Sequence, residues 1–160
     1  MLNVTVLCVG TLKERYWREA CEEYVKRLGA FCRAQVVELA EERAPENPSA
    51  AQIMQVLSAE GKRILAKIPA DSAVMALCIE GKPISSPQLA AQLEQLAVGG
   101  KSHLVVVIGG SWGLSDEVKA RANWRLSMSP MTFPHQLARV MVLEQLYRAA
   151  QIQSGGRYHK

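Results

Sequence analysis

The chain has 160 residues with a formal net charge of +4, and 49% of them are hydrophobic. A chain of this size can bury about two-thirds of its unfolded surface in one core, so we expect a single domain over residues 1–160. No apolar run approaches the ~20 residues that cross a bilayer, and the first residues lack both the basic region and the cleavage site of a signal peptide. This composition excludes a transmembrane protein, and we expect a cytoplasmic one.

Residues 2–9 are mostly apolar, end at Gly10 and predict a first strand. Residues 12–28 place apolar side chains on one helical stripe, and residues 34–39 indicate a second strand. Two prolines and several charged residues then predict a loop over 41–48. The first third of the chain is thus expected to fold as strand, helix, strand and loop.

Ser49 and Gln52 have the spacing of a capping box and predict the start of a helix, which Gly61 is expected to weaken or interrupt. Residues 73–79 are continuously apolar, as in a strand buried on both faces. Ser86 is expected to be the N-cap of the next helix, with Pro87 at its first position.

The remaining elements follow the same alternation. We expect a buried strand over 103–108, a short helix over 116–122 and a last strand over 125–129. A long final helix is predicted from Pro134 to about Gln153, followed by two glycines and the tail Arg157-Tyr158-His159-Lys160.

This alternation predicts an α/β fold, a parallel sheet with helices on both faces. Ligands of such sheets bind beyond the carboxyl ends of the strands. The loops at 80–83, 109–113 and 129–134 each follow a predicted strand. We therefore expect these three loops to meet at one pocket.

Two of these loops have compositions suited to ligand binding. The glycines of 109–113 would let backbone approach a ligand closely, although a plain strand-to-helix turn is an equal interpretation. The loop does not match the dinucleotide or phosphate-loop fingerprints, which disfavours an ordinary doubly wound nucleotide enzyme. Around 127–135, two prolines would hold a rigid segment whose backbone could read the edge of an adenine between apolar side chains. The alternative is a rigid loop that only introduces the last helix.

The final helix combines an apolar surface with a few charged residues. His135 and Arg139 share one face, and Glu144 and Arg148 are placed to form an ion pair on roughly the opposite face. Since the helix is apolar almost all round, it needs burial on several sides, and a subunit interface is plausible.

Charge and cysteine usage bear on the partners. From residue 119 onwards seven basic residues accompany a single acid, which gives this segment +6 and leaves −2 for the rest. Such asymmetry favours a polyanionic partner, although a solvated basic face fits charge alone equally well.

A metal site needs clustered ligands, whereas the cysteines and histidines here are scattered, so we expect no metal and free, mostly buried thiols. The cysteines are Cys8, Cys21, Cys32 and Cys78.

Several stretches together resemble the YbeA-like SPOUT methyltransferases. They are LCIEGKP at 77–83, IGG at 108–110, LSMSPMTFPHQLARV at 126–140, LEQLYRA at 143–149 and the terminal YHK at 158–160. The resemblance covers the whole chain. It implies a trefoil knot, in which the C-terminal segment is threaded through a loop, and a homodimer with the cofactor pocket near the interface.

The resemblance also implies an activity. Members use S-adenosylmethionine to methylate N3 of a pseudouridine in large-subunit (23S) ribosomal RNA on the assembled ribosome. The residues that would bind the cofactor are Leu77, Gly109, Met128, Ser129, Pro130, Met131, Thr132 and Phe133. The family commonly has an acid after the leucine at 77, whereas this chain has Cys78, so we expect no polar role there. The alternative is a ribosome- or RNA-binding SPOUT protein without catalysis.

The chemistry indicates which residues could act on the substrate. N3 carries a proton that must leave, which calls for a general base or for stabilisation of the developing anion. The candidates are Tyr158 and His159, with Arg148 or Arg139, and the tail is expected to fold over the pocket and contact the target base. Contacts to RNA are expected from Arg139, His135 and Lys160.

Overall fold

Five parallel strands form one sheet in the order β2-β1-β4-β3-β5, in a computed structural model that describes residues 1–160. All four strand pairs are parallel, so the carboxyl ends of the strands share one edge. The predicted parallel sheet is confirmed. The strands are β1 (Asn3–Val9), β2 (Arg33–Leu39), β3 (Ala73–Pro83), β4 (His103–Ile108) and β5 (Trp124–Ser127).

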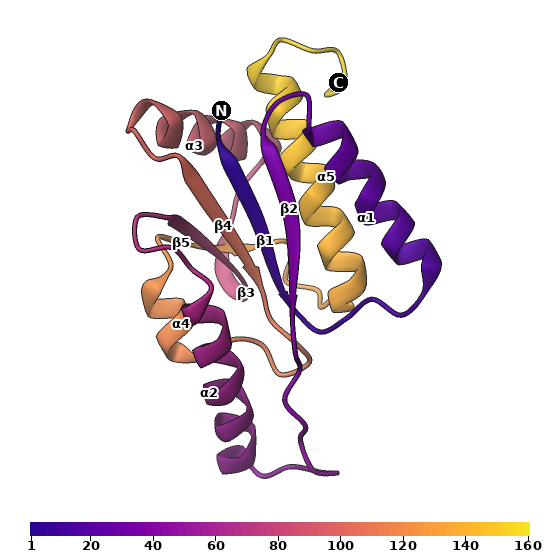
Figure 1. Cartoon of the computed structure of the whole chain (residues 1–160), viewed down its shortest axis with the longest axis vertical. Helices are drawn as coiled ribbons and strands as arrows, with labels where there is room; N and C mark the ends of the chain where they lie inside the picture. Colours follow the sequence, from indigo (N-terminus) through magenta and orange to yellow (C-terminus); the bar gives the residue numbers. More distant parts are fainter.

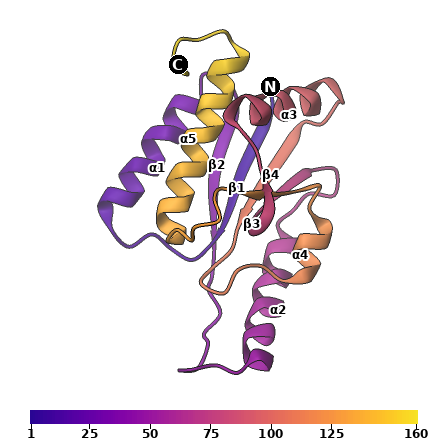
Figure 2. The same ribbon diagram turned by 180° about the vertical axis from the view of Figure 1, so that it is seen from behind.

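Helices cover both faces of the sheet, as expected. Helices α1, α3 and α5 pack on one face, and α2 and α4 pack on the other (Figures 1 and 2). No helix combines the length and the apolar character that crossing a membrane requires. The helices are α1 (Arg15–Leu28), α2 (Ala50–Ala66), α3 (Ser86–Val98), α4 (Asp116–Arg121) and α5 (His135–Gln153).

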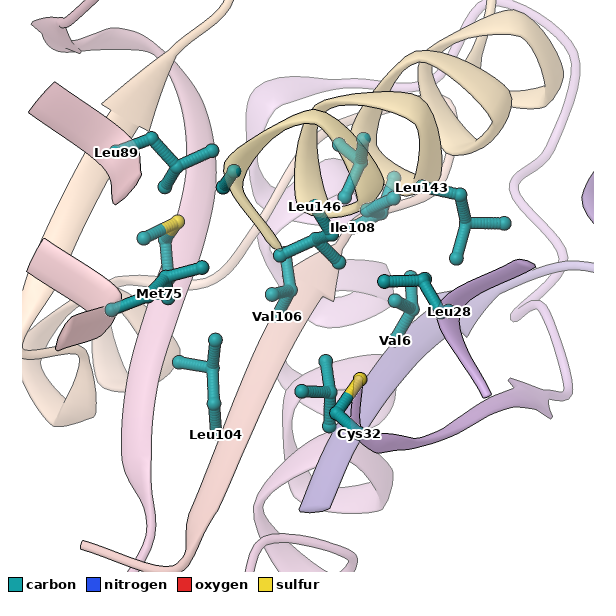
Figure 3. Packing of buried hydrophobic residues seen from close by; sticks show 14 of the residues in the cluster. Val6, Leu28, Cys32, Met75, Leu89, Leu104, Val106, Ile108, Leu143 and Leu146 are labelled. Atoms are coloured by element: carbon teal, nitrogen blue, oxygen red, sulfur yellow. The ribbon is translucent and has the colours of Figure 1, made fainter. Parts of the chain in front are cut away.

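Successive side chains of the central strands enter different cores because strand side chains alternate between faces. Val6 and Val106 pack toward α1, α3 and α5, where Leu143 lies beside them (Figure 3). Leu7 and Val105 belong to the second core, which α2 and α4 cover. This burial on both faces explains the continuous apolar runs of the strand sequences.

All four cysteines are free and buried, as the sequence predicts. Burial raises the pKa of each thiol, and that of Cys8 reaches about 12. These thiols are protonated at neutral pH and act as small apolar groups of the core.

Two predicted details of the helices are wrong. Gly61 does not interrupt α2, which is continuous; instead, a Cβ at this position would lie 2.4 Å from Ser115 Oγ, so the glycine allows α2 to approach the start of α4. The N-cap of α3 is Ser85 rather than Ser86, because Ser85 and Gln88 form a capping box. The capping box of Ser49 and Gln52 is confirmed.

Arg139 lies in the interior rather than on an RNA-binding surface. Its side chain is 2% exposed, Nη1 donates to Glu38 Oε2 at 2.6 Å, and Nη2 donates to the Gly10 carbonyl at 3.2 Å. The same carboxylate oxygen accepts the Leu12 N–H at 3.0 Å. The expectation that Arg139 contacts RNA is therefore corrected: this guanidinium ties α5 to the ends of β1 and β2.

Replacing Glu38 with alanine should destabilise the fold by about 2 kcal/mol, because the buried Arg139 guanidinium would lose its carboxylate partner. The loss is smaller than for a fully buried pair, since the Glu38 side chain is partly exposed to water. Urea unfolding of Glu38→Ala measures this loss. The matched control is Glu19→Ala, which breaks the exposed Arg15–Glu19 pair and should cost less than about 0.5 kcal/mol. Equal losses in the two variants would contradict a buried structural role for Arg139.

Candidate active site

A cavity of about 700 Å³ opens where β3, β4 and β5 end. Residues 77–80 within β3 and the segments that follow β4 and β5 line it, together with the start of α5 and one residue of α4. The prediction that three loops meet at one pocket is confirmed for 109–113 and 129–134, whereas residues 80–83 belong to β3 and only Glu80 of them lines the cavity. Of the predicted cofactor residues all but Pro130 line the cavity: Leu77, Gly109, Met128, Ser129, Met131, Thr132 and Phe133.

One wall is a bulge within β3. Leu126 of β5 pairs with both Leu77 and Lys82, so residues 78–81 leave the ladder. A Cβ at Gly81 would lie 2.7 Å from the Arg125 carbonyl oxygen, and only glycine lets the bulge return against β5. Three residues of the bulge line the cavity: Cys78, Ile79 and Glu80. Periodicity had indicated only a loop after residue 79, because an apolar run does not reveal a bulge.

The glycine loop, residues 109–113, forms a second wall. The Gly113 N–H donates to the Gly110 carbonyl at 3.1 Å, which closes a tight turn. A Cβ at Gly109 would lie 2.5 Å from the Gly113 carbonyl oxygen, so this turn admits no side chain there. Trp112 lines the cavity and is 45% exposed. This loop is therefore a wall of the cavity as well as a strand-to-helix turn.

The charged groups of the cavity were not found from the sequence. Glu80 on the bulge forms an ion pair with Lys119 on α4, and this contact lowers the pKa of Glu80. His135, which we had assigned to RNA, lines the same cavity. The remaining lining is largely apolar. The cavity thus suits a ligand with a flat or apolar body and few charged groups.

Three predicted catalytic residues, Arg148, Tyr158 and His159, lie together around Glu144. Arg148 donates to Glu144 Oε1 through Nη2 at 2.6 Å and through Nε at 3.0 Å, which confirms that predicted ion pair. Tyr158 Oη donates to the same oxygen at 3.1 Å, and Arg148 Nη1 lies 3.2 Å from His159 Nδ1. The Tyr158 ring also packs edge-on against Tyr147. We call Glu144, Arg148, Tyr158 and His159 the tail cluster.

The tail cluster does not cover the cavity of its own chain. His135 at the first residue of α5 lines the cavity, whereas Arg148 comes 13 residues later on the same helix. At 1.5 Å per residue, these positions are separated by roughly 20 Å along the helix axis. Figure 1 shows the C-terminus at the far end of α5. Within one chain the tail therefore does not fold over the pocket, because the contact of Tyr158 with Tyr147 holds it beside α5. Contact of the tail with the target base stays a prediction.

Comparison with known proteins finds matches over almost the whole chain. A family model described as "Predicted SPOUT methyltransferase" matches residues 2–159. The chain is also similar to a ribosomal RNA large subunit methyltransferase H from Clostridioides difficile (strain 630). The two are 48% identical over 159 residues, which span 99% of this chain and 100% of that protein. The matched region contains the cavity and all four residues of the tail cluster.

Proposed function

The chain belongs to the SPOUT methyltransferase family, and from this premise we propose that it transfers the methyl group of S-adenosylmethionine to N3 of a pseudouridine in large-subunit ribosomal RNA. The observation that carries the proposal is the cavity at the strand ends, whose walls are the segments that resemble the cofactor-binding segments of the family. The name of the 48% identical relative supports ribosomal RNA as the substrate.

The residues present fit S-adenosylmethionine. The volume of about 700 Å³ lies within the range of small-molecule sites. Gly109 allows the tight turn of the glycine loop, whose backbone lines the cavity, and Phe133 and Met128 provide apolar surface for an adenine. When bound, the cofactor supplies a methyl group on a sulfonium that is already activated. The task of these residues is to hold and orient it and to exclude water.

The substrate end of the site comes from a second copy of the chain in this proposal. The tail cluster lies roughly 20 Å from the cavity along α5, so one subunit cannot bring the two together. A second cavity of about 310 Å³, lined by nine hydrophobic residues of 13, lies beside α5 and α3. This apolar surface suits a homodimer in which the tail of each subunit reaches the cavity of its partner.

Three residues of the tail cluster have distinct chemical capabilities. Burial and the neighbouring Tyr24 and Glu144 raise the pKa of Tyr158 to about 12, so its hydroxyl donates hydrogen bonds at neutral pH and does not act as a base. Arg148 provides positive charge for the anion that develops on the base when N3 loses its proton. The imidazole of His159 is the group of the cluster suited to accept that proton.

RNA would be held by phosphate contacts outside the cavity. Lys160 remains a candidate, whereas His135 lines the cavity itself and Arg139 is buried. A dimer doubles the small basic footprint of one chain, which suits the assembled ribosome in the cytoplasm as the substrate.

The proposed fold is a single domain over residues 1–160 with a trefoil knot. Figures 1 and 2 show the segment after β5 passing from the sheet edge to the face that carries α5, and the family resemblance supports the knot.

Mass spectrometry of large-subunit RNA from a strain that lacks this gene tests the activity. We expect one methylated pseudouridine to lose its methyl group, and the purified protein to restore it on assembled ribosomes with S-adenosylmethionine. Naked RNA should be a poor substrate, because the proposal places recognition on the assembled particle. An unchanged modification profile, combined with ribosome binding, would instead favour an RNA-binding protein without catalysis.

A further inference from the structure

A buried carboxyl group lies behind the glycine loop. Glu60 on α2 is 3% exposed, and its Oε2 accepts the Glu42 N–H at 3.0 Å. Its Oε1 is buried without a hydrogen-bond partner in the protein. A buried carboxyl is costly, and an apolar side chain of similar size would fill this space without that penalty. The position therefore has a requirement beyond packing.

The neighbour of this carboxyl group is the backbone of Gly110. A Cβ built on Gly110 would lie 3.6 Å from both oxygens of Glu60 and 3.2 Å from Val9 Cγ1. The carboxyl group thus lies beside the loop backbone with no side chain between them, and the same loop lines the cavity. A side chain of different shape at position 60 would therefore change the surface beside Gly110.

Two further contacts hold residues 110–115 against α2 and against the segment after β2. Ser111 Oγ donates to Glu41 Oε1 at 3.3 Å, and Gly61 packs against Ser115 with no room for a Cβ. Residues 110–115 are thus supported by α2 and by the segment after β2. Glu60 is the centre of this support, since it contacts both Glu42 and the position of Gly110.

From this arrangement we propose that Glu60 is a positioning residue of the cofactor pocket, which fixes the glycine loop in the form that binds S-adenosylmethionine. The inference rests on the proposed function for the identity of the ligand. Its structural part, that Glu60 fixes the loop, stands without it.

The charge environment favours the neutral form of this carboxyl group. Burial raises the pKa of Glu60, and the carboxylates of Glu41 and Glu42 act in the same direction, whereas the Glu42 N–H and Arg63 lower it. The residues of the glycine loop carry no charge. Glutamine keeps the shape of the side chain and one oxygen that can accept the Glu42 N–H, and it is therefore the conservative replacement.

The test compares Glu60→Gln, Glu60→Met and Ile64→Ala. Ile64 lies one turn further along α2 and is 1% exposed in the core, so its truncation destabilises α2 but leaves the Glu60 side chain in place. Titration calorimetry with S-adenosylmethionine should give about tenfold weaker binding for Glu60→Met, with Glu60→Gln within about threefold of the parent protein. Ile64→Ala should bind as the parent does while being less stable.

Hydrogen exchange without ligand provides the second measurement. Amides of residues 110–115 should exchange faster in Glu60→Met than in the parent protein, and those of β1 should not. Faster exchange without cofactor binding by any variant, the parent included, would overturn the proposed function but support the role of Glu60. Unchanged exchange and affinity in Glu60→Met, or equal weakening in Ile64→Ala, would overturn the role of Glu60.

Discussion

Deleting residues 158–160 should abolish methyl transfer and leave the affinity for S-adenosylmethionine within about twofold of the parent value. The deletion removes Tyr158 and His159 from the tail cluster, roughly 20 Å from the cavity of the same chain. None of the deleted residues lines that cavity. Turnover measured on ribosomes and calorimetry measured on the free protein separate these two effects.

Mixing experiments then ask which subunit supplies the tail. One partner is the deletion variant, whose cavity is intact, and the other is a full-length variant whose cavity cannot bind the cofactor. If the tail acts on the cavity of the other subunit, random pairing at equal amounts should restore about a quarter of the parent activity, because half of the dimers then hold one complete site of two. No recovery in mixed dimers would contradict the proposed arrangement. Arg157→Ala, which keeps the tail, is the matched control for lost charge.

The cavity could be predicted from the sequence because it depends on local rules. Apolar runs locate the strands, and the carboxyl ends of parallel strands meet at one edge, so the loops at Gly109 and Met128 had to lie close together. The bulge after Leu77 could not be predicted in this way. It depends on Leu126 pairing twice, which is a property of the neighbouring strand rather than of residues 78–81.

The tail and Arg139 show where such rules end. The four last residues have no periodicity, and their place is decided by contacts of Tyr158 with Tyr147 and Glu144 on α5. The sequence predicts that Arg139, a charged residue on an apolar helix, is exposed. Its partner Glu38 lies 101 residues away, so the ion pair that allows its burial cannot be seen locally. Long-range pairing of this kind carries no local signal. Because Arg139 is buried, the basic C-terminal quarter presents less positive charge at the surface than its sequence suggests.

Gly109→Ala should remove cofactor binding almost completely. The new Cβ would lie 2.5 Å from the carbonyl oxygen and 2.8 Å from the carbonyl carbon of Gly113. These are backbone atoms of the same turn, so the turn has to open. Since a misplacement of about 1 Å can cost a hundredfold in activity, we expect affinity for S-adenosylmethionine to fall by at least about a hundredfold. This variant is also the cavity-defective partner for the mixing experiment.

Gly100→Ala separates this effect from the ordinary consequence of replacing a glycine. Gly100 has a φ of +80° with no atom within 4 Å of a Cβ, and it lies in the turn before β4, away from the cavity lining. Alanine there meets only backbone strain, so stability should fall by about 1 kcal/mol while cofactor affinity stays unchanged. Unfolding curves and calorimetry on both variants make the comparison. Parent-like binding by Gly109→Ala would show that the glycine loop does not hold the cofactor, and the cavity would then need another ligand.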